Sequence, residues 1–491
     1  MTTGVLLSHD IQLVPDPHLM ESMRAVGYNL ETAIADLVDN SITARAGAID
    51  VLFSPEDDPY IAIVDDGVGM SRGEAQNAMR LAGVSSTGER DPRDLGRFGL
   101  GLKTASISQC RRVTLISKRG DSVHGFRWDL DYLVSTGSWS LQELDRDEIA
   151  GLPGMHVLDK HESGTMVLWT NLDRLTSATT DVSQTIDERM KLAREHLGLV
   201  FHRFLAGEHG AKLTISVNYR PIAGADPLLS QHTATQKGPV ERIPIEGSVI
   251  EVRPFTLPHI AHLSEADRRR AQVGGTLRDS QGFYVYRALR LVIWGTWFRV
   301  SPKQELGKLA RVRVDIPNTL DHLWHLDIKK SQAMPPPAIR NRLKGFADRI
   351  VAPSRRVHTY RGRSARVDTT RHLWDVIADR DVFRYEINRT HPALEALAAT
   401  LDAEQLEAVE TVLELVESNF PVDDVYNRIG QDEKHQPAGG VSSELERHGR
   451  RLWEAYRGRI SADEFVDLMA SSEPFVGDSA GRALLERIVA E

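Results

Sequence analysis

An apolar strand that runs into a glycine turn is the feature that most constrains how this chain can fold. Residues 60–70 read YIAIVDDGVGM, so a strand over 59–65 ends in Asp65 and the backbone must then turn at Gly67 and Gly69. Glycine adopts positive φ and lets a flat ligand approach the backbone closely. A buried carboxylate at a strand end can accept a hydrogen bond from an exocyclic amine, such as that of adenine. Taken alone, a plain Asp-Gly turn between two strands explains this segment equally well.

The segment 31–46, ETAIADLVDNSITARA, has the spacing of an amphipathic helix. Its apolar residues share one face: Ile34, Leu37, Val38 and Ile42. Asp36, Asn40 and Thr43 are spaced i, i+4 and i+7 on the opposite face. The Asn40 amide oxygen can hold Mg²⁺, and the Asp36 carboxylate can orient or deprotonate an attacking water. Taken alone, the segment is better explained by a surface helix whose polar residues face solvent.

A glycine-rich run at 94–106, DLGRFGLGLKTAS, leads into a predicted helix start at LKTAS. The backbone amides around Gly96, Gly99 and Gly101 can form an anion site for phosphates where they lead into a helix N-terminus. The run lacks the GxxxxGK[ST] spacing of a Walker A loop. It also lacks the preceding strand and the following acidic residue of a Rossmann fingerprint.

The run 163–172, SGTMVLWTNL, begins a strand at Gly164-Thr165. The Thr165 hydroxyl at this point can reach a bound base directly or through water. A β-branched residue that merely starts a strand is the stronger explanation when the run is taken alone. The four segments therefore gain their meaning from their order and spacing along the chain.

In order and spacing, the four segments resemble the motifs of the GHKL superfamily of ATPases, which includes gyrase, the heat-shock chaperone, histidine kinases and MutL. Residues 36–40 resemble the E-x-x-x-N motif of that family, and residues 65–69 resemble its D-x-G-x-G motif. Residues 96–101 resemble the glycine-rich lid motif, and residues 164–165 resemble the late G-T. The phrases DLVDNSITARA and GRFGLGLKTAS are most similar to MutL and to bacterial MORC-like ATPases.

The resemblance implies a site for ATP and Mg²⁺. Asp65 would bind the adenine amine, with support from Thr165. Asn40 would coordinate Mg²⁺, and Asp36 would activate water. The resemblance also implies these nucleotide-binding residues: Gly67, Gly69, Met70, Gly96, Gly99, Leu100, Gly101, Leu102, Lys103 and Thr104. The segment 83–95 would be the ATP lid, and its Gly, Ser and charged composition suits a mobile loop.

Two residues depart from the family pattern. Asp36 stands where the family has Glu, and its side chain is shorter by one methylene, which is roughly 1.3 Å. A misplacement of about 1 Å can cost ~100-fold in rate, so hydrolysis would be slow unless the helix sits closer to the nucleotide. Asp39 is the alternative base, but it lies about 60° around the helix from Asp36. Thr43 stands where relatives often carry Asp.

A second α/β domain is predicted after the first. A helical pattern covers 187–206. Strand patterns follow at 212–217, 283–288, 290–294 and 310–316. The run 282–294 resembles the transducer domain of MutL, MORC and the heat-shock chaperone, and 325–333 is similar to the loop whose basic residue reaches the γ-phosphate there. Lys330, or else Lys329, would then stabilise charge on the leaving phosphate. A solvated charge pair at a strand end is the alternative.

The predicted fold class is α+β, in three parts. Residues 1–180 would form a Bergerat-type ATP-binding α/β sandwich, residues 181–350 a transducer-like (ribosomal S5-like) α/β domain, and residues 351–491 a helical module. Helical patterns dominate from residue 370 onward, and the clearest are HPALEALAATL, AEQLEAVETVLELVESNF and SELERHGRRLWEAYRG. The polar stretch 427–443 is predicted as a linker or flexible loop.

Composition narrows the cellular setting. A net charge of −9 excludes a wholly basic nucleic-acid coat, and a single cysteine, Cys110, excludes an internal disulfide and a thiolate zinc site. Cys110 follows an apolar run, so we predict a buried small hydrophobe in a protein of the reducing cytosol, with a cytoplasmic location. No window reaches ~18 consecutive apolar residues, so no membrane span is expected.

Two functions fit the sequence. The first is an ATPase whose lid closes on ATP and brings two protomers together, as a switch or clamp. It would act on DNA or RNA if the basic stretch 340–371, with ten Lys/Arg and two acids, contacts phosphates. A solvated basic helix face explains that stretch equally well, and a role in bacterial defence or DNA restriction follows from the MORC-like resemblance alone.

The second is a chaperone-like or regulatory ATP-binding module with little hydrolysis, which docks a protein partner through the C-terminal helices. A histidine kinase is disfavoured because neither His391 nor His448 precedes the ATP-binding domain.

Overall fold

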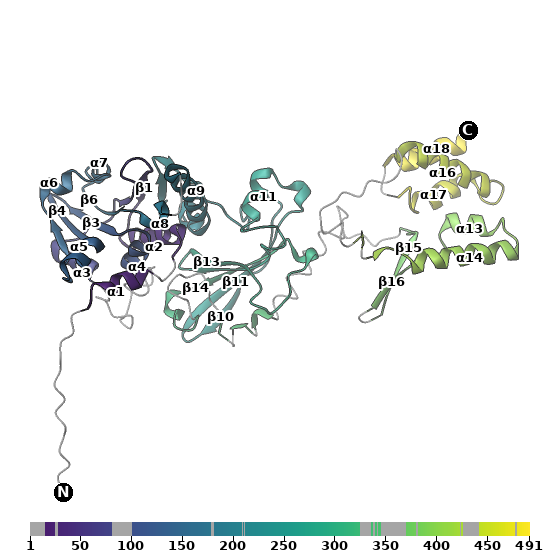
Figure 1. Cartoon of the computed structure of the whole chain (residues 1–491). Coiled ribbons are helices and arrows are strands. Elements are labelled where there is room, and N and C mark those ends of the chain that lie inside the picture. The colour runs from purple at the N-terminus through teal and green to yellow at the C-terminus, as the bar shows by residue number, and fades with distance from the viewer. Residues whose placement is uncertain are drawn as a thin grey trace, which may run out of the picture. The chain divides into compact units, whose positions relative to one another are not determined.

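The computed structural model divides the chain into two compact units, Met1–Thr359 and Tyr360–Glu491 (Figure 1). It describes residues 15–24, 28–80, 101–177, 181–208, 210, 212–324, 335–336, 339–340, 342–344, 370–379, 382–422, 424–425, 441–476 and 479–491. Several predictions lie outside these residues: those for the lid segment 83–95, for Gly96, Gly99 and Leu100, for Lys329 and Lys330, and for most of the stretches 340–371 and 427–443.

An eight-stranded sheet organises the first unit, with strand order β5-β4-β3-β6-β2-β1-β7-β8. Its strands are β1 (Ala48–Ser54), β2 (Tyr60–Asp65), β3 (Arg112–Arg119), β4 (Ser122–Asp129), β5 (Gln142–Leu144), β6 (Ser163–Thr170), β7 (Thr214–Val217) and β8 (Arg220–Pro221). β1 and β7 are parallel, and the other neighbouring strands are antiparallel. In the registers of β2, β6 and β3, Asp65 pairs with Thr165 and Thr165 pairs with Ser117.

Helices cover both faces of this sheet. Among the described residues, the helices of the unit include α1 (His18–Met23), α2 (Leu30–Thr43), α3 (Arg72–Met79), α4 (Gly101–Gln109), α5 (Leu130–Thr136), α6 (Arg146–Ala150), α7 (Met155–Leu158), α8 (Asp173–Thr176), α9 (Val182–Val200), α10 (His202–Leu205) and α11 (Glu265–Ala271). α2, α4 and α9 belong to the main core, together with Val167 and Trp169 of β6. α6 and α7 share a smaller core with Met166 and Leu168. Since side chains alternate along a strand, Thr165 lies on the face of the main core.

Helix α2 is buried nearly all round. The Asn29 side chain caps its N-terminus by accepting a backbone N–H hydrogen bond of 2.9 Å. Asp36 and Asp39 are 4% and 1% exposed, so the alternative of a surface helix with solvated polar residues is wrong. The helix ends at Thr43 rather than at residue 46, because the backbone reaches a positive φ of 62° at Arg45.

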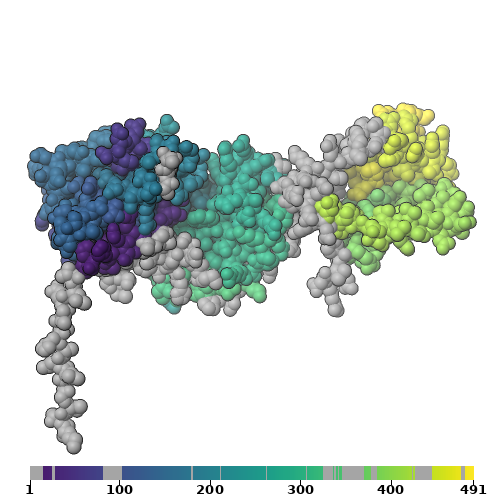
Figure 2. Space-filling model, viewed as in Figure 1, coloured from purple at the N-terminus to yellow at the C-terminus, as the bar shows by residue number. Residues whose placement is uncertain are grey.

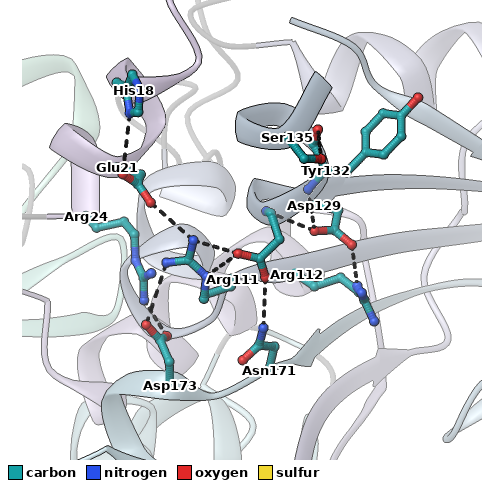
Figure 3. A network of polar contacts seen from close by, with 11 residues as sticks. His18, Glu21, Arg24, Arg111, Arg112, Asp129, Tyr132, Ser135, Asn171 and Asp173 are labelled. Atoms are coloured by element: carbon teal, nitrogen blue, oxygen red, sulfur yellow. Dashed lines mark hydrogen bonds and ion pairs between the residues drawn. The ribbon is translucent and has the colours of Figure 1, made fainter. Parts of the chain in front are cut away.

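A network of charged side chains fastens α1 to the first sheet (Figure 3). Arg111 Nη2 lies 3.1 Å from Glu21 Oε1 and 2.7 Å from Asp131 Oδ1. Arg24, just after α1, pairs with Asp173 at the start of α8. These contacts close the end of the main core next to α4. Buried beside them is Cys110, as the sequence predicted.

A second sheet follows in the same unit, with strand order β10-β11-β14-β12-β13 and with β9 paired to β11. Its strands are β9 (Gln236–Lys237), β10 (Glu241–Ile245), β11 (Ser248–Thr256), β12 (Gly282–Arg287), β13 (Arg290–Thr296) and β14 (Ala310–Ile316). β12 and β14 are parallel, and the other pairs are antiparallel. β12 and β13 form a hairpin whose turn residues, Ala288 and Leu289, have φ of 45° and 73°. Two consecutive positive φ values are typical of a tight type I′ turn.

The first sheet continues beyond residue 180, where the sequence predicted the end of the ATP-binding domain. α9 and α10 contribute to the main core, and β7 and β8 extend the sheet to residue 221. The hydrophobic pattern of 181–221 predicts a helix followed by strands, but it does not reveal which sheet those strands join.

The second unit contains a β-hairpin and five helices among its described residues. They are β15 (Trp374–Asp379), β16 (Val382–Ile387), α13 (Pro392–Ala398), α14 (Ala403–Ser418), α16 (Val441–Tyr456), α17 (Ala462–Ala470) and α18 (Ser479–Ala490). Figure 2 shows the green and yellow parts of this unit against each other, and the Tyr456 hydroxyl donates to the Pro392 carbonyl at 2.8 Å. The three helical patterns named from the sequence correspond to α13, α14 and α16, and the hairpin was not predicted. The α+β class is confirmed. In the described parts of the chain, no helix is long and apolar enough to cross a membrane.

Candidate functional site

The candidate site is centred on Asp65, the last residue of β2. Ser41 of α2 donates its hydroxyl to Asp65 Oδ2 at 2.7 Å. The backbone N–H groups of Gly67 and Thr165 donate to Asp65 Oδ1 at 3.0 and 3.1 Å. Burial raises the pKa of Asp65, and the three donors oppose that rise because they stabilise the charged form. The carboxylate is therefore fixed in place by a helix, a turn and a neighbouring strand.

Glycines allow backbone segments to approach Asp65 closely. The sequence predicted a turn at Gly67 and Gly69, and Gly69 has a positive φ of 62°. A Cβ at Gly69 would lie 2.0 Å from the Lys118 carbonyl oxygen, and a Cβ at Gly164 would lie 2.0 Å from the Asp65 carbonyl oxygen. A side chain at Gly69 would force the turn away from β3, and a side chain at Gly164 would force β6 away from β2. The turn and the G-T segment are thus two sides of one tightly packed corner.

Ser117 of β3 completes the polar row beside Asp65. Its hydroxyl accepts from the backbone N–H of Met70 at 2.8 Å and lies 3.4 Å from the Thr165 hydroxyl. Three adjacent strands therefore present Asp65, Thr165 and Ser117 in one line, with Met70 held over its end. The motif-based prediction missed Ser117, since a lone serine in a strand has no sequence signature.

Helix α4 places the predicted residues Leu102, Lys103 and Thr104 in its first turns. Gly101 is the first residue of this helix. The Lys103 ammonium is buried and donates to the Arg80 carbonyl at 2.5 Å, and its burial lowers the pKa of Lys103. Its side chain is thus committed to the protein, and the implied phosphate contact would come from its backbone amide. Thr104 is buried as well.

Asp36 and Asn40 lie one turn apart on α2, as predicted, but Asp36 does not face solvent. The Tyr28 hydroxyl donates to Asp36 Oδ2 at 3.1 Å, and Arg290 Nη2 lies 3.5 Å from Asp36 Oδ1. The Asn40 side chain is half-buried at this point of the helix. Thr43 instead donates its hydroxyl to the Asp39 carbonyl at 2.9 Å.

The sequence reasoning also missed Ser41, Tyr28 and Arg290. Ser41 directly follows Asn40, so the helical spacing could have placed it near the site. Arg290 is 254 residues from Asp36 along the chain. A contact of that separation gives no local pattern, and only the packing of the two sheets creates it.

Comparison with known proteins assigns the first part of the chain. Residues 28–165 match the family described as "Histidine kinase-, DNA gyrase B-, and HSP90-like ATPase". The chain is also 24% identical over 191 residues to "DNA mismatch repair protein MutL" of Rickettsia conorii (strain ATCC VR-613 / Malish 7), and likewise to that of Rickettsia africae (strain ESF-5). Each alignment covers 37% of this chain and 28% of the relative. The matched range holds the Asp65 corner and helix α2, so residues 28–165 form an ATPase domain of the GHKL type.

Proposed function

We propose that this protein binds ATP with Mg²⁺ at the Asp65 corner and hydrolyses it, and that ATP drives lid closure and dimerisation as a switch or clamp. The observation that carries the proposal is the buried carboxylate of Asp65, held by three donors between Gly69 and Gly164. An ionised carboxylate offers about four acceptor positions. Three are used here, so one remains for the adenine amino group, beside the hydroxyls of Thr165 and Ser117.

The residues present also fit a magnesium ion that arrives with the phosphates. Mg²⁺ prefers oxygen ligands and keeps several waters, so one carboxamide oxygen together with phosphate oxygens can hold it. Asn40 supplies that oxygen, one turn from Asp36. Among the described residues, no three His, Cys, Asp or Glu side chains are grouped to hold a metal by themselves. Mg²⁺ would supply neutralisation of phosphate charge, and Asp36 would orient the attacking water.

Action on DNA is the part of the proposal that rests on the relatives. The two relatives are named as DNA mismatch repair proteins, and the basic stretch 340–371 remains the predicted contact. The alternative, a regulatory module that acts on a protein partner, is favoured by α14. Three apolar side chains of this helix, Val412, Leu415 and Val416, are 57%, 58% and 46% exposed, which suits a protein contact.

Nucleotide binding and phosphate release, measured in parallel, test the proposal. We expect the wild type to bind Mg-ATP and to release phosphate slowly. Asp65→Asn should lose ATP binding. The side-chain amide would point an N–H donor at the adenine amino group, which is itself a donor. Asp36→Ala should bind ATP but hydrolyse it at least about 100-fold more slowly, because a positioned base usually contributes that much to the rate. A wild type that binds no ATP would contradict the proposal, and binding without phosphate release would reduce the protein to a nucleotide-sensing switch.

A further inference from the structure

An arginine of the second sheet reaches the acidic face of α2. Arg290, the first residue of β13, places Nη2 3.5 Å from Asp36 Oδ1 and Nε 2.9 Å from Asp39 Oδ1. The Asp39 contact is an ion pair outside good hydrogen-bond geometry. All three side chains are buried, with 4%, 4% and 1% exposure for Arg290, Asp36 and Asp39. One guanidinium thus serves two carboxylates that lie one helical turn apart.

The β12–β13 hairpin holds Arg290 in this position. Its turn residues, Ala288 and Leu289, pack against the main core beneath the first sheet, as does Trp294 of β13. The guanidinium carbon of Arg290 also lies 5.6 Å from the centre of the Phe201 ring, within cation–π range. The arginine is therefore seated by the packing of the second sheet on the first domain.

The positive charge of Arg290 affects the carboxylate of Asp36. Two carboxylates in one buried region disfavour each other's ionised form, and an opposite charge within ~4–6 Å restores it. Burial, and then the positive charge of Arg290, lower the pKa of His196 in α9 to about 4, so His196 is neutral at neutral pH. The Tyr28 hydroxyl faces Asp36 as a neutral donor. Within the described part of the chain, Arg290 is a cation that contacts both acids.

The element on the other side of α2 does not supply that charge. Lys103 of α4 is buried, but its ammonium donates to the Arg80 carbonyl rather than to an acid of α2. A buried ion pair is often no more stabilising than well-packed apolar groups of similar volume, so its presence on α2 is weak evidence for a purely stabilising role. The acid that Arg290 reaches is the one that the proposed hydrolysis needs.

We propose that Arg290 is a positioning residue through which the second sheet orients the Asp36 carboxylate and balances its charge for ATP hydrolysis. This inference rests on the proposed function, because it assigns Asp36 to the attacking water. Turnover then depends on how the β12–β13 hairpin is seated, whereas ATP binding at Asp65 does not.

Kinetics of Arg290→Met against a matched control give the first test. Arg287 is the control: it lies on the same hairpin, is buried, and makes two 2.7 Å bonds to Asp321 instead of to α2. We expect Arg290→Met to keep the ATP affinity of Arg287→Met and to lose kcat about 10- to 100-fold at neutral pH. Arg287→Met, which leaves the contact between Arg290 and Asp36 in place, should keep the wild-type kcat.

A third variant separates charge from packing. Adding Asp39→Asn to Arg290→Met removes the competing carboxylate, so kcat at neutral pH should rise above that of Arg290→Met alone. Arg290→Lys should give an intermediate kcat. A lysine ammonium keeps the positive charge but lacks the planar set of donors with which a guanidinium contacts two carboxylates at once. A role limited to folding predicts neither the loss of kcat at equal nucleotide affinity nor its rescue by Asp39→Asn.

A measurement on the nucleotide-free protein keeps the inference separate from the proposed function. Without Arg290, the buried Asp36 carboxylate loses a cation that it contacts, and an uncompensated buried charge is destabilising. Adding Asp36→Asn should therefore restore part of the melting temperature that Arg290→Met loses, whereas adding it to Arg287→Met should restore none. The same response of both variants to Asp36→Asn, or a kcat of Arg290→Met equal to or above wild type, would overturn the inference. A wild type without phosphate release would instead sink the proposed hydrolysis, and the melting curves alone would then decide whether Arg290 balances the pair.

Discussion

Asp65 carries a conflict between function and stability. Its carboxylate is 5% exposed, and burial raises its pKa although Ser41, Gly67 and Thr165 all donate to it. A buried charge without a cation is costly, and functional residues commonly bear such a cost. Asp65 is thus better suited to hold a ligand than to hold the fold together.

This conflict gives Asp65→Asn a stability effect with a definite sign. Because the folded pKa of Asp65 lies above the unfolded value of about 3.9, the folded protein binds more protons, and stability falls as the pH rises between the two values. An amide has no such dependence, and it can still accept from the N–H groups of Gly67 and Thr165. We expect the melting temperature of nucleotide-free Asp65→Asn to exceed that of wild type at pH 8, with a smaller difference near pH 4.

The adjacent Asp66 provides the control for that measurement. Its Oδ1 accepts from the backbone N–H groups of Gly47 and Ala48 at 2.8 and 2.9 Å, but the side chain is half-buried. Asp66→Asn should therefore not raise the melting temperature at pH 8. If Asp65→Asn were less stable than wild type throughout this pH range, the carboxylate would stabilise the folded state. That result would contradict the argument that burying this charge lowers the free energy of unfolding.

The sequence predicted the individual site residues to the extent that they lie in short motifs. Asp65, Asp36 and Asn40 each sit where strand and helix patterns placed them, because one carboxylate follows an apolar run and two polar residues share a helical spacing. Ser117 and Arg290 could not be found this way. Ser117 reaches the site through pairing of β3 with β6, and Arg290 reaches it through packing between sheets.

At the scale of elements, the site depends on how closely β2 and β6 approach. Asp65 and Thr165 are paired in the register of these strands, and Gly164 lies against the Asp65 carbonyl. The corner that would hold adenine therefore exists because one strand carries a glycine where the other carries a carboxylate. Strand pairing, rather than the turn alone, sets the geometry of the site.

Gly164→Ala tests that dependence. Its Cβ would lie 2.0 Å from the Asp65 carbonyl oxygen, so β6 must move away from β2. We expect a loss of about 1–3 kcal/mol in the free energy of unfolding, typical of overpacking, together with loss of ATP affinity. Gly73→Ala in α3 is the control, because a Cβ there meets no atom within 4 Å. It should be neutral or slightly stabilising, and a Gly164→Ala variant that behaves in the same way would contradict the predicted strand displacement.

Elements with a strong hydrophobic period were predicted to within a few residues. The strands predicted at 59–65, 111–118 and 164–170 correspond to β2, β3 and β6, because uninterrupted apolar runs mark strands buried on both faces. The β15–β16 hairpin was not predicted, since its short strands precede long helical patterns and four of their twelve residues are charged. Helix α2 was predicted too long because Ala44 and Arg45 carry no glycine signal for its end.

At the scale of the whole molecule, the two units have separate cores. The first unit is built on two sheets whose cores meet at the β12–β13 hairpin and α9. The second unit has its own core, in which Phe465 and Phe475 are the largest fully buried side chains. Since stability is cooperative within a core, each unit should unfold as a unit of its own.

ATP distinguishes the two units during thermal unfolding. A ligand that binds only the folded state adds RT ln(1 + [L]/Kd), about 2.7 kcal/mol at a concentration of 100 times Kd, to the unit that binds it. We expect calorimetry of the full chain to show two transitions, of which Mg-ATP raises only the one that belongs to residues 1–359. Asp65→Asn should abolish that shift and leave the other transition in place. A single transition that moves as a whole with ATP would show that the C-terminal unit unfolds together with the nucleotide site. Transmission of the ATP state to residues 360–491 would then proceed through shared stability rather than through a separately folded module.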